Sequence, residues 1–427
     1  MENEFYFNDD YSEMVIDSES ICGKCYNIKH FDKLILKRVD YKKRLIKFIC
    51  GCSSLKQKDP DLDKPKAYWV GYVFHYSGYS IMNRNILNNI INKANIKLLS
   101  PIDGIDCSLS EAKNISEHTH YSFSDNSPIV FCSANSKRKN DNYIINFTMS
   151  EFEKTESKGF LDYLNINDEI WVPTEWNKRQ YELIGYNKPI VKIPLAVDTN
   201  IFNRKQNNLS YTSGTNTFKF LSISSWLWRK GFDILIKSYV QAFREKDDVT
   251  LILMTKNLVV ENNIEDDILK IVNSVRNYDL PHIVLCSAKI PEEAMSYVYS
   301  DSDCFSLISR GEGWGLPYCE SICCETPVIS SYCCGSTEFL DDNSYLVKPD
   351  LLNKTDPSML WTDFYNNSYF NDFSIDKIYE ISGIMKEVVD NYSIAKNKVL
   401  LAKENFTKKY SWGKTSDLVY NRILMNQ

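Results

Sequence analysis

A glycine-rich run between a predicted strand and a predicted helix constrains this chain more than any other segment. It reads Ser309-Arg-Gly-Glu-Gly-Trp-Gly-Leu-Pro-Tyr-Cys-Glu320. The apolar stretch 304–308 before it predicts a buried strand, and Pro317 predicts a helix start, because a proline there loses no needed N–H group. We therefore expect Glu312 in the loop at the strand's carboxyl end and Glu320 about one turn into the helix.

This arrangement suits a nucleotide-linked substrate. The backbone N–H groups of Gly313, Gly315 and Leu316 are expected to face one crevice, where free N–H groups and the helix dipole favour phosphate. The carboxylates of Glu312 and Glu320 accept hydrogen bonds from sugar hydroxyls. The alternative is an ordinary strand-turn-helix junction with two solvated glutamates.

The whole run resembles the E-x7-E signature of the retaining glycosyltransferases of family 4, which have the GT-B fold. The resemblance covers residues 67–420. It implies an α/β chain in which two doubly wound, Rossmann-like parallel-sheet domains face a cleft. It also implies transfer of a sugar from a nucleotide-diphosphate donor to an acceptor hydroxyl, with retained anomeric configuration. By the resemblance, Glu312 orients the donor sugar and Glu320 holds the ribose hydroxyls.

Polar, turn-rich segments divide the chain into four parts. We expect an N-terminal extension at 1–65, an acceptor domain at 66–205, a donor domain at 206–400 and a C-terminal helix at 401–427 that crosses back to the first domain. Strands and helices alternate in both middle parts, which predicts parallel sheets covered on both faces. The expected strands are 69–74, 129–132, 143–147, 169–172, 218–223, 250–254, 282–286, 304–308 and 327–330, and the expected helices include 81–96, 231–243 and 291–299.

A second signal is a pair of cations, Arg229 and Lys230, between the first strand and the first helix of the donor domain. Cations at such a connection stabilise a departing diphosphate, whereas an isolated basic pair is usually only solvated. In family 4 the lysine of a matching Lys-Gly binds the donor phosphates, so the resemblance gives Lys230 that role. Position 224 is serine where many members have arginine, and Arg229 is the candidate to supply that charge.

Two further segments are expected at the donor. Cys334-Gly-Ser-Thr-Glu338 is similar to the family's Gly-Gly-x-x-Glu segment, which makes Gly335 and Glu338 donor-binding candidates. Glu338 could equally be an ordinary carboxylate at a helix start. Gly78 lies in a loop whose glycine, by the resemblance, lets the backbone approach the donor phosphates. His75 in the same loop is either a catalytic candidate or a packing residue, and Glu325 stands where the family usually has glycine.

Four cysteines in the extension are spaced as two close pairs around a predicted hairpin: Cys22, Cys25, Cys50 and Cys52. Two thiolate pairs can complete a tetrahedral zinc site, although the single residue between Cys50 and Cys52 is tighter than usual. Structural zinc and buried free thiols both remain open. Catalysis itself requires no metal if protein cations stabilise the diphosphate.

Composition restricts the class of partner. The net charge of −6 gives no sign of a nucleic-acid binder, which usually has a strongly basic domain. No window approaches 18 uninterrupted apolar residues, so we expect no membrane span. The acidic start lacks a signal core, so we expect a cytoplasmic protein. The acceptor could be a glycan, lipid or protein hydroxyl. The rivals are a nucleotide-sugar epimerase of the same architecture and a degenerate transferase that acts as a binding protein.

Overall fold

The computed structural model describes most of the chain beyond residue 59. The described residues are 2–7, 14–15, 37–40, 45–49, 60–73, 77–99, 115, 126–132, 141–205, 217–256, 263–288, 290–356, 365 and 367–427. In the first four of these ranges only the backbone strands are described. They form a sheet in the order β2 (Met14–Val15), β1 (Glu2–Phe7), β4 (Leu45–Ile49), β3 (Lys37–Asp40).

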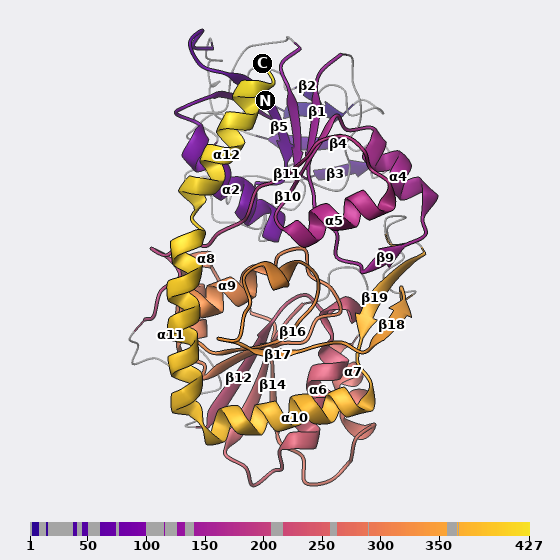
Figure 1. Cartoon of the computed structure of the whole chain (residues 1–427), viewed down its shortest axis with the longest axis vertical. Coiled ribbons are helices and arrows are strands. Elements are labelled where there is room, and N and C mark those ends of the chain that lie inside the picture. Colours follow the sequence, from indigo (N-terminus) through magenta and orange to yellow (C-terminus); the bar gives the residue numbers. More distant parts are fainter. Residues whose placement is uncertain are drawn as a thin grey trace.

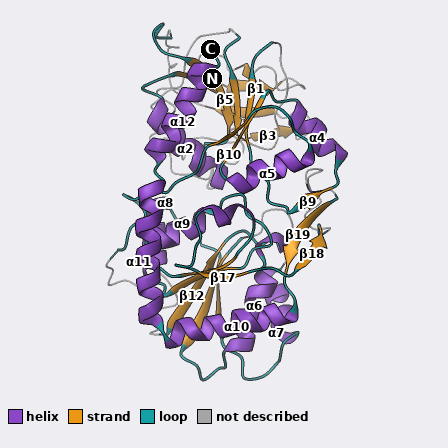
Figure 2. Ribbon diagram, in the orientation of Figure 1, coloured by secondary structure: helices purple, strands orange, loops and turns teal. Residues whose placement is uncertain are grey.

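Two separate parallel sheets of six strands each lie in an upper and a lower lobe (Figures 1 and 2). The upper sheet has the order β11 (Ile190–Lys192), β10 (Glu169–Val172), β8 (Ile144–Phe147), β7 (Ile129–Cys132), β5 (Lys66–Gly71), β6 (Asn95–Leu99). The chain moves outward from β5 to β6 and then continues on the other side with β7. The strand order therefore reverses between β5 and β7, which is where doubly wound sheets bind ligands.

The lower sheet repeats this plan. Its order is β14 (His282–Cys286), β13 (Val249–Met254), β12 (Phe218–Ile223), β15 (Cys304–Leu307), β16 (Val328–Ser331), β17 (Tyr345–Val347). Here the order reverses between β12 and β15. The central strands β13, β15 and β16 are buried along their whole length, as expected for strands covered on both faces.

Helices cover the sheets of both lobes (Figure 2). The upper lobe has α2 (Gly78–Ile90), α4 (Lys158–Asn165) and α5 (Glu175–Ile184). The lower lobe has α6 (Phe232–Ala242), α7 (Ile264–Asn273), α8 (Glu292–Ser300), α9 (Leu316–Cys323) and α10 (Ile375–Asp390). Most of α6 is apolar and buried, and it packs against α10, so the lower core is closed on that side.

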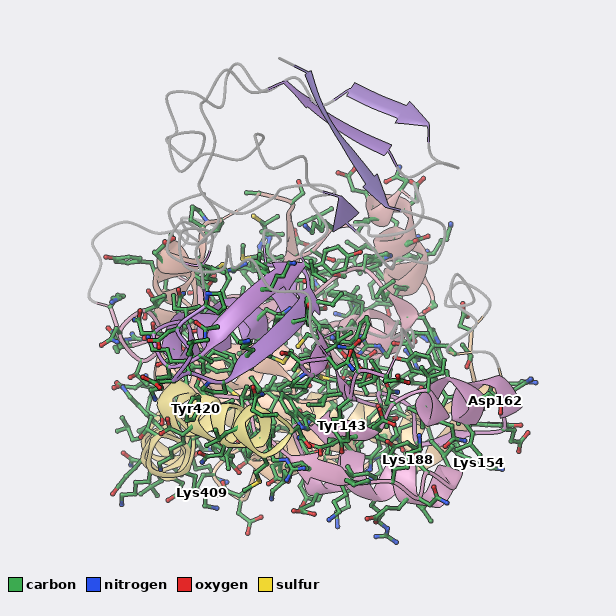
Figure 3. All side chains as sticks on the ribbon, turned by 90° about the horizontal axis from the view of Figure 1, so that it is seen from above. Tyr143, Lys154, Asp162, Lys188, Lys409 and Tyr420 are labelled. Atoms are coloured by element: carbon green, nitrogen blue, oxygen red, sulfur yellow. The ribbon has the colours of Figure 1, made fainter. Side chains whose placement is uncertain are left out.

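Three elements connect the lobes. α11 (Tyr392–Lys409) runs up the lower lobe, and α12 (Trp412–Met425) continues into the upper lobe and packs on α2 (Figure 1). A small antiparallel sheet joins β9 (Lys154–Thr155) of the upper lobe to β19 (Ser368–Asp372) and β18 (Leu351–Lys354) of the lower. Seen from above, Lys409 and Tyr420 lie on one side of the molecule, and Lys154, Asp162 and Lys188 on the other (Figure 3).

The expected strands agree with the observed ones to within a few residues, and the main error is a helix. The expected helix 81–96 ends at Ile90 in the structure, and its last residues begin β6 at Asn95. The apolar spacing of the helix continues into Ile91 and Ile96, which hid the boundary. Asn95 marks it, because its side chain bonds the backbone of residues 61 and 64 instead of a helix.

Two expectations concern residues outside the described ranges. The zinc hypothesis stays a prediction because these ranges do not include Cys22, Cys25, Cys50 and Cys52. They do not include His75 either, so its role also stays a prediction. Within the described part of the chain, no cluster of three or more His, Cys, Asp or Glu could hold a metal ion. None of the described helices has the length and apolarity needed to cross a bilayer.

Candidate active site

Two loops meet at the point where the strand order of the lower sheet reverses. The first loop follows β12 and ends in a short 3-10 helix, η2 (Trp228–Lys230), and the second follows β15 and carries Glu312. Lys230 Nζ lies 2.6 Å from Glu312 Oε1. Both predicted groups thus share one crevice beyond the carboxyl ends of the strands, the usual ligand position in such sheets.

Arg229 joins this pair to the upper lobe. Its NH2 atom lies 3.0 Å from Glu151 Oε1, and its NH1 atom lies 3.7 Å from Glu312 Oε2. NH1 also donates a hydrogen bond of 2.5 Å to the carbonyl of Gly311. The guanidinium is therefore held by protein oxygens on two sides, and only its buried Nε lacks a partner in the described structure.

The cluster is buried but charged. Burial alone would raise the pKa of Glu312, but the charges of Lys230 and Arg229 outweigh it and hold that pKa below its ordinary value. Burial, together with the Arg229 charge, lowers the pKa of Lys230 in spite of Glu312. Burial opposes the charge of Arg229, but Glu151 and Glu312 raise its pKa above the ordinary value. Glu312 is thus an ionised carboxylate between two cations.

A buried arginine fixes the loop that carries Glu312. Arg310 makes two hydrogen bonds of 2.8 Å to the carboxylate of Asp233 in the first turn of α6, and its Nε lies 2.9 Å from Asp372. Its guanidinium also lies 4.4 Å from the centre of the Trp228 ring. Planar, bidentate contacts of this kind set orientation as well as distance, so Arg310 holds both loops of the crevice in register.

Glycines allow the loops to touch. Gly335 N donates to Glu312 O at 2.8 Å, and a Cβ on Gly335 would lie 1.9 Å from the Gly313 carbonyl oxygen. Asn177 of α5 donates to that same carbonyl at 2.8 Å. Gly313 and Gly335, both predicted to bind the donor, thus lie together. The side chain of Asn177 from the upper lobe contacts them at Gly313.

The predicted phosphate-binding N–H groups are available. No hydrogen bond within the described part of the chain uses the N–H groups of Gly313, Gly315 and Leu316. Gly315 has φ +95°, a left-handed value that glycine adopts at little cost, and it immediately precedes α9. Across the interface, a Cβ on Gly78 would lie 3.8 Å from Leu316 Cδ1. The start of α2 therefore faces the start of α9.

Glu320 lies on α9 in a different environment from Glu312. Its Oε2 accepts a 2.7 Å hydrogen bond from the Tyr299 hydroxyl of α8. Burial raises the pKa of Glu320 to about 7, the hydrogen bond from Tyr299 opposes this, and the charge of Glu292 adds to it. Among the described residues, no cation balances Glu320 as Lys230 balances Glu312.

Glu338 lies apart from this cluster. Its carboxylate accepts hydrogen bonds of 3.0 Å from Lys192 Nζ and from the backbone N–H of Glu175, the first residue of α5. A carboxylate at a helix N-terminus is favourable, so Glu338 connects the lobes in the manner of a helix-start residue. It also lines a cavity of about 560 Å³ whose wall includes Lys348 and Tyr410 but not Glu312. Its donor-binding role stays a prediction.

Four residues of the site were not predicted from the sequence: Glu151, Asn177, Tyr299 and Arg310. Arg310 sits inside the glycine-rich run, and its position beside Glu312 was a usable signal. Glu151 follows the expected strand 143–147 by four residues, so its place beyond a strand's carboxyl end was also a usable signal. Asn177 and Tyr299 lie on ordinary amphipathic helices, and only the three-dimensional packing shows their contacts.

Part of the chain matches a known family model, and most of it matches a relative. Residues 203–356 match the family model described as "Glycosyl transferases group 1". This stretch contains Arg229, Lys230, Glu312, Glu320 and Glu338. An uncharacterized glycosyltransferase of Methanocaldococcus jannaschii is 27% identical over 360 residues, which are 80% of this chain and 86% of that protein.

Solved structures show the same architecture. The Anabaena protein HepE, crystallised with UDP and glucose, has a TM-score of 0.61 at 12% identity, with 84% of this chain and 100% of that chain covered. Sucrose-phosphate synthase from Thermosynechococcus elongatus has a TM-score of 0.61 at 13% identity, with 85% and 100% covered. The chain has the GT-B fold. At such identities the likeness establishes the fold alone.

Proposed function

We propose that this protein is a glycosyltransferase of the family 4 type. It moves a sugar from a nucleotide-diphosphate donor to an acceptor hydroxyl with retained anomeric configuration. The observation that carries the proposal is the 2.6 Å contact between Lys230 and Glu312 at the reversal point of the lower sheet, inside the region that matches the group 1 model. HepE, which has the same fold, was crystallised with UDP-glucose, so a UDP-hexose is the first donor to test.

On the donor side, Lys230 would turn from Glu312 to the diphosphate and stabilise it as it leaves. The free N–H groups of Gly313, Gly315 and Leu316 would bind phosphate oxygens at the start of α9. Glu320 would accept hydrogen bonds from the ribose hydroxyls. Arg229 would act by holding Glu312 ionised and in place. Gly78 and Gly335 would let the backbone approach the donor, and no metal is needed for these steps.

The two lobes would then divide the work. Residues 66–205 form the acceptor domain and residues 206–400 the donor domain, and residues 401–427 tie the second back to the first. Closure of the lobes over the donor would exclude water and limit hydrolysis. The acceptor hydroxyl belongs to a glycan, a lipid or a protein.

The test starts with a thermal-shift screen of UDP-, GDP-, ADP- and dTDP-hexoses at saturating concentration, followed by an assay of nucleoside diphosphate release. We expect Lys230→Met to lower kcat/KM for the donor by about 100-fold or more. The exposed control Lys246→Met should match the wild type. Stabilisation without turnover would instead indicate a binding protein, and sugar interconversion without nucleotide release would indicate an epimerase.

A further inference from the structure

The carboxylate of Glu151 is the feature of the crevice that the donor chemistry leaves unused. It lies in the loop after β8, at the carboxyl end of the upper sheet, and so belongs to the acceptor lobe. Its Oε1 contacts Arg229 NH2 at 3.0 Å, and Arg229 in turn lies beside Glu312. One cation therefore stands between a carboxylate of the acceptor lobe and a carboxylate of the donor lobe.

The loop of Glu151 is pressed against the loop of Glu312. A Cβ on Gly311 would lie 1.7 Å from the Glu151 carbonyl oxygen, and a Cβ on Gly313 would lie 2.3 Å from Met149 Cγ. Only glycine allows these approaches. The position of Glu151 relative to Glu312 is thus set by backbone packing across the two lobes, and not by one flexible side chain.

Glu151 is the least buried of the three described glutamates of the crevice. The Glu312 side chain is only 7% exposed and is bound by Lys230. Glu320 is bound by Tyr299 at the other end of the glycine-rich run. The Glu151 side chain is 21% exposed, and its Oε2 accepts a hydrogen bond from the Tyr365 hydroxyl. Arg229 and Tyr365 aim this carboxylate while leaving part of it open.

The surroundings of Glu151 on the acceptor lobe carry hydroxyl groups. Tyr79 lies close to both Glu151 and Thr148, and Tyr181 lies close to Thr148 and Glu151. The Thr148 and Tyr181 hydroxyls are buried, and the Thr148 side chain interacts with the hydroxyls of both Tyr79 and Tyr181. Glu151 therefore lies beside a group of hydroxyl-bearing side chains of its own lobe.

We propose that Glu151 is the proton acceptor for the attacking hydroxyl, a catalytic role that rests on the proposed transferase function. As the acceptor oxygen bonds to the anomeric carbon, its proton passes to a Glu151 carboxylate oxygen. The bond from the anomeric carbon to the diphosphate oxygen breaks, and its electron pair leaves with the nucleoside diphosphate. Glu151 then returns the proton to solvent. Tyr365 is a positioning residue that acts through Glu151.

Donor hydrolysis tests this role without knowledge of the natural acceptor, because water then serves as acceptor. The donor is whichever hexose conjugate of the screened panel the wild type hydrolyses. We expect Glu151→Gln and Glu151→Ala to lower the hydrolysis rate about 100-fold or more, with the Kd for the matching nucleoside diphosphate changed less than about threefold. Tyr365→Phe should have a smaller effect, of roughly tenfold. Glu153→Gln, in the same loop, should match the wild type.

Azide separates proton transfer from a structural role, since it attacks without giving up a proton. We expect azide to restore nucleotide release by Glu151→Ala to within about tenfold of the wild type with azide, with glycosyl azide as the product. Three results would overturn the role of Glu151 but leave the proposed function standing. They are azide transfer that falls as far as hydrolysis, weakened nucleotide binding, and unchanged hydrolysis in Glu151→Gln. A wild type that turns over no donor would overturn the proposed function as well.

Discussion

At the scale of single residues, the two glutamates of the glycine-rich run have opposite electrostatic surroundings. Glu312 lies between Lys230 and Arg229, which keep it ionised. Glu320 is equally buried, but its described partner is the neutral hydroxyl of Tyr299. Burial without a cation favours the protonated form, so one motif supplies a permanent anion and a carboxyl group that titrates near neutral pH.

This difference predicts a pH-dependent stability. The folded protein holds the pKa of Glu320 at about 7 against an ordinary 4.5, so the unfolded chain releases this proton first as the pH rises. Stability is therefore lost between pH 4.5 and pH 7, by on the order of 3 kcal/mol. In urea unfolding without nucleotide, Glu320→Gln should equal the wild type near pH 5 and exceed it at pH 8.

The exposed control Glu245→Gln should follow the wild type at every pH. Parallel curves for Glu320→Gln and the wild type from pH 5 to pH 8 would show that Glu320 does not titrate in this range.

The site was partly predictable at this scale. The sequence predicted Lys230 and Glu312 in two strand-to-helix connections, and the observed strand order of the lower sheet brings these two connections together. The contacts of Glu151 and Asn177 with the donor loop depend on how the two lobes are oriented. No local pattern encodes that orientation.

At the scale of elements, the end of α9 explains a departure from the family pattern. Glu325 has φ +60°, a left-handed value that costs a residue with a Cβ about 1–2 kcal/mol. Its N–H bonds the carbonyl of Ile322, and the N–H of Thr326 bonds that of Ser321, which is the Schellman pattern that usually places glycine here. The glycine expected by resemblance thus suits a left-handed conformation that Glu325 adopts at a cost.

Glu325→Gly should therefore raise the free energy of unfolding by about 1 kcal/mol, as the relief of strain exceeds the loss of a half-exposed ion pair. That pair joins Glu325 Oε1 to Lys403 Nζ at 2.9 Å. Glu325→Gln loses the pair alone and should cost about 0.5 kcal/mol or less. A glycine variant less stable than the glutamine variant in chemical denaturation would refute this explanation.

Elements in general were easier to predict than their ends. The strand 218–223 was predicted with its observed bounds because the whole apolar run is one strand. The helix 81–96 was too long because the helical spacing of its apolar residues continues by chance into the start of β6. The boundary between the helix and β6 is marked by hydrogen bonds of the Asn95 side chain to residues distant in sequence. The spacing of apolar residues cannot show such bonds.

At the scale of the whole molecule, a buried ion pair connects the lobes near the donor site. Arg84 of α2 lies 2.9 Å from Glu292 of α8, and the side chains are 4% and 10% exposed. Arg84 also donates to the carbonyl of Val73, at 3.0 Å. Removal of one partner leaves the other charge buried without compensation, which is costly, whereas removal of both often costs little.

We expect Arg84→Met to lower the free energy of unfolding by about 3–5 kcal/mol and Arg84→Met/Glu292→Met to recover a large part of that loss. Lys93→Met breaks an exposed pair with Asp417 of α12 and should cost less than about 1 kcal/mol. Strictly additive losses in this double-mutant cycle would mean that the two charges do not stabilise the closed arrangement together.

Binding of a nucleotide-sugar diphosphate in the crevice around Lys230 and Glu312 underlies every role proposed for this protein. A crystal structure of the protein with the bound donor from the screened panel tests it most directly. We expect the diphosphate at Lys230 Nζ and at the N–H groups of Gly313, Gly315 and Leu316, with the ribose at Glu320. A donor bound elsewhere, with Lys230 still paired to Glu312 and the crevice empty, would contradict it.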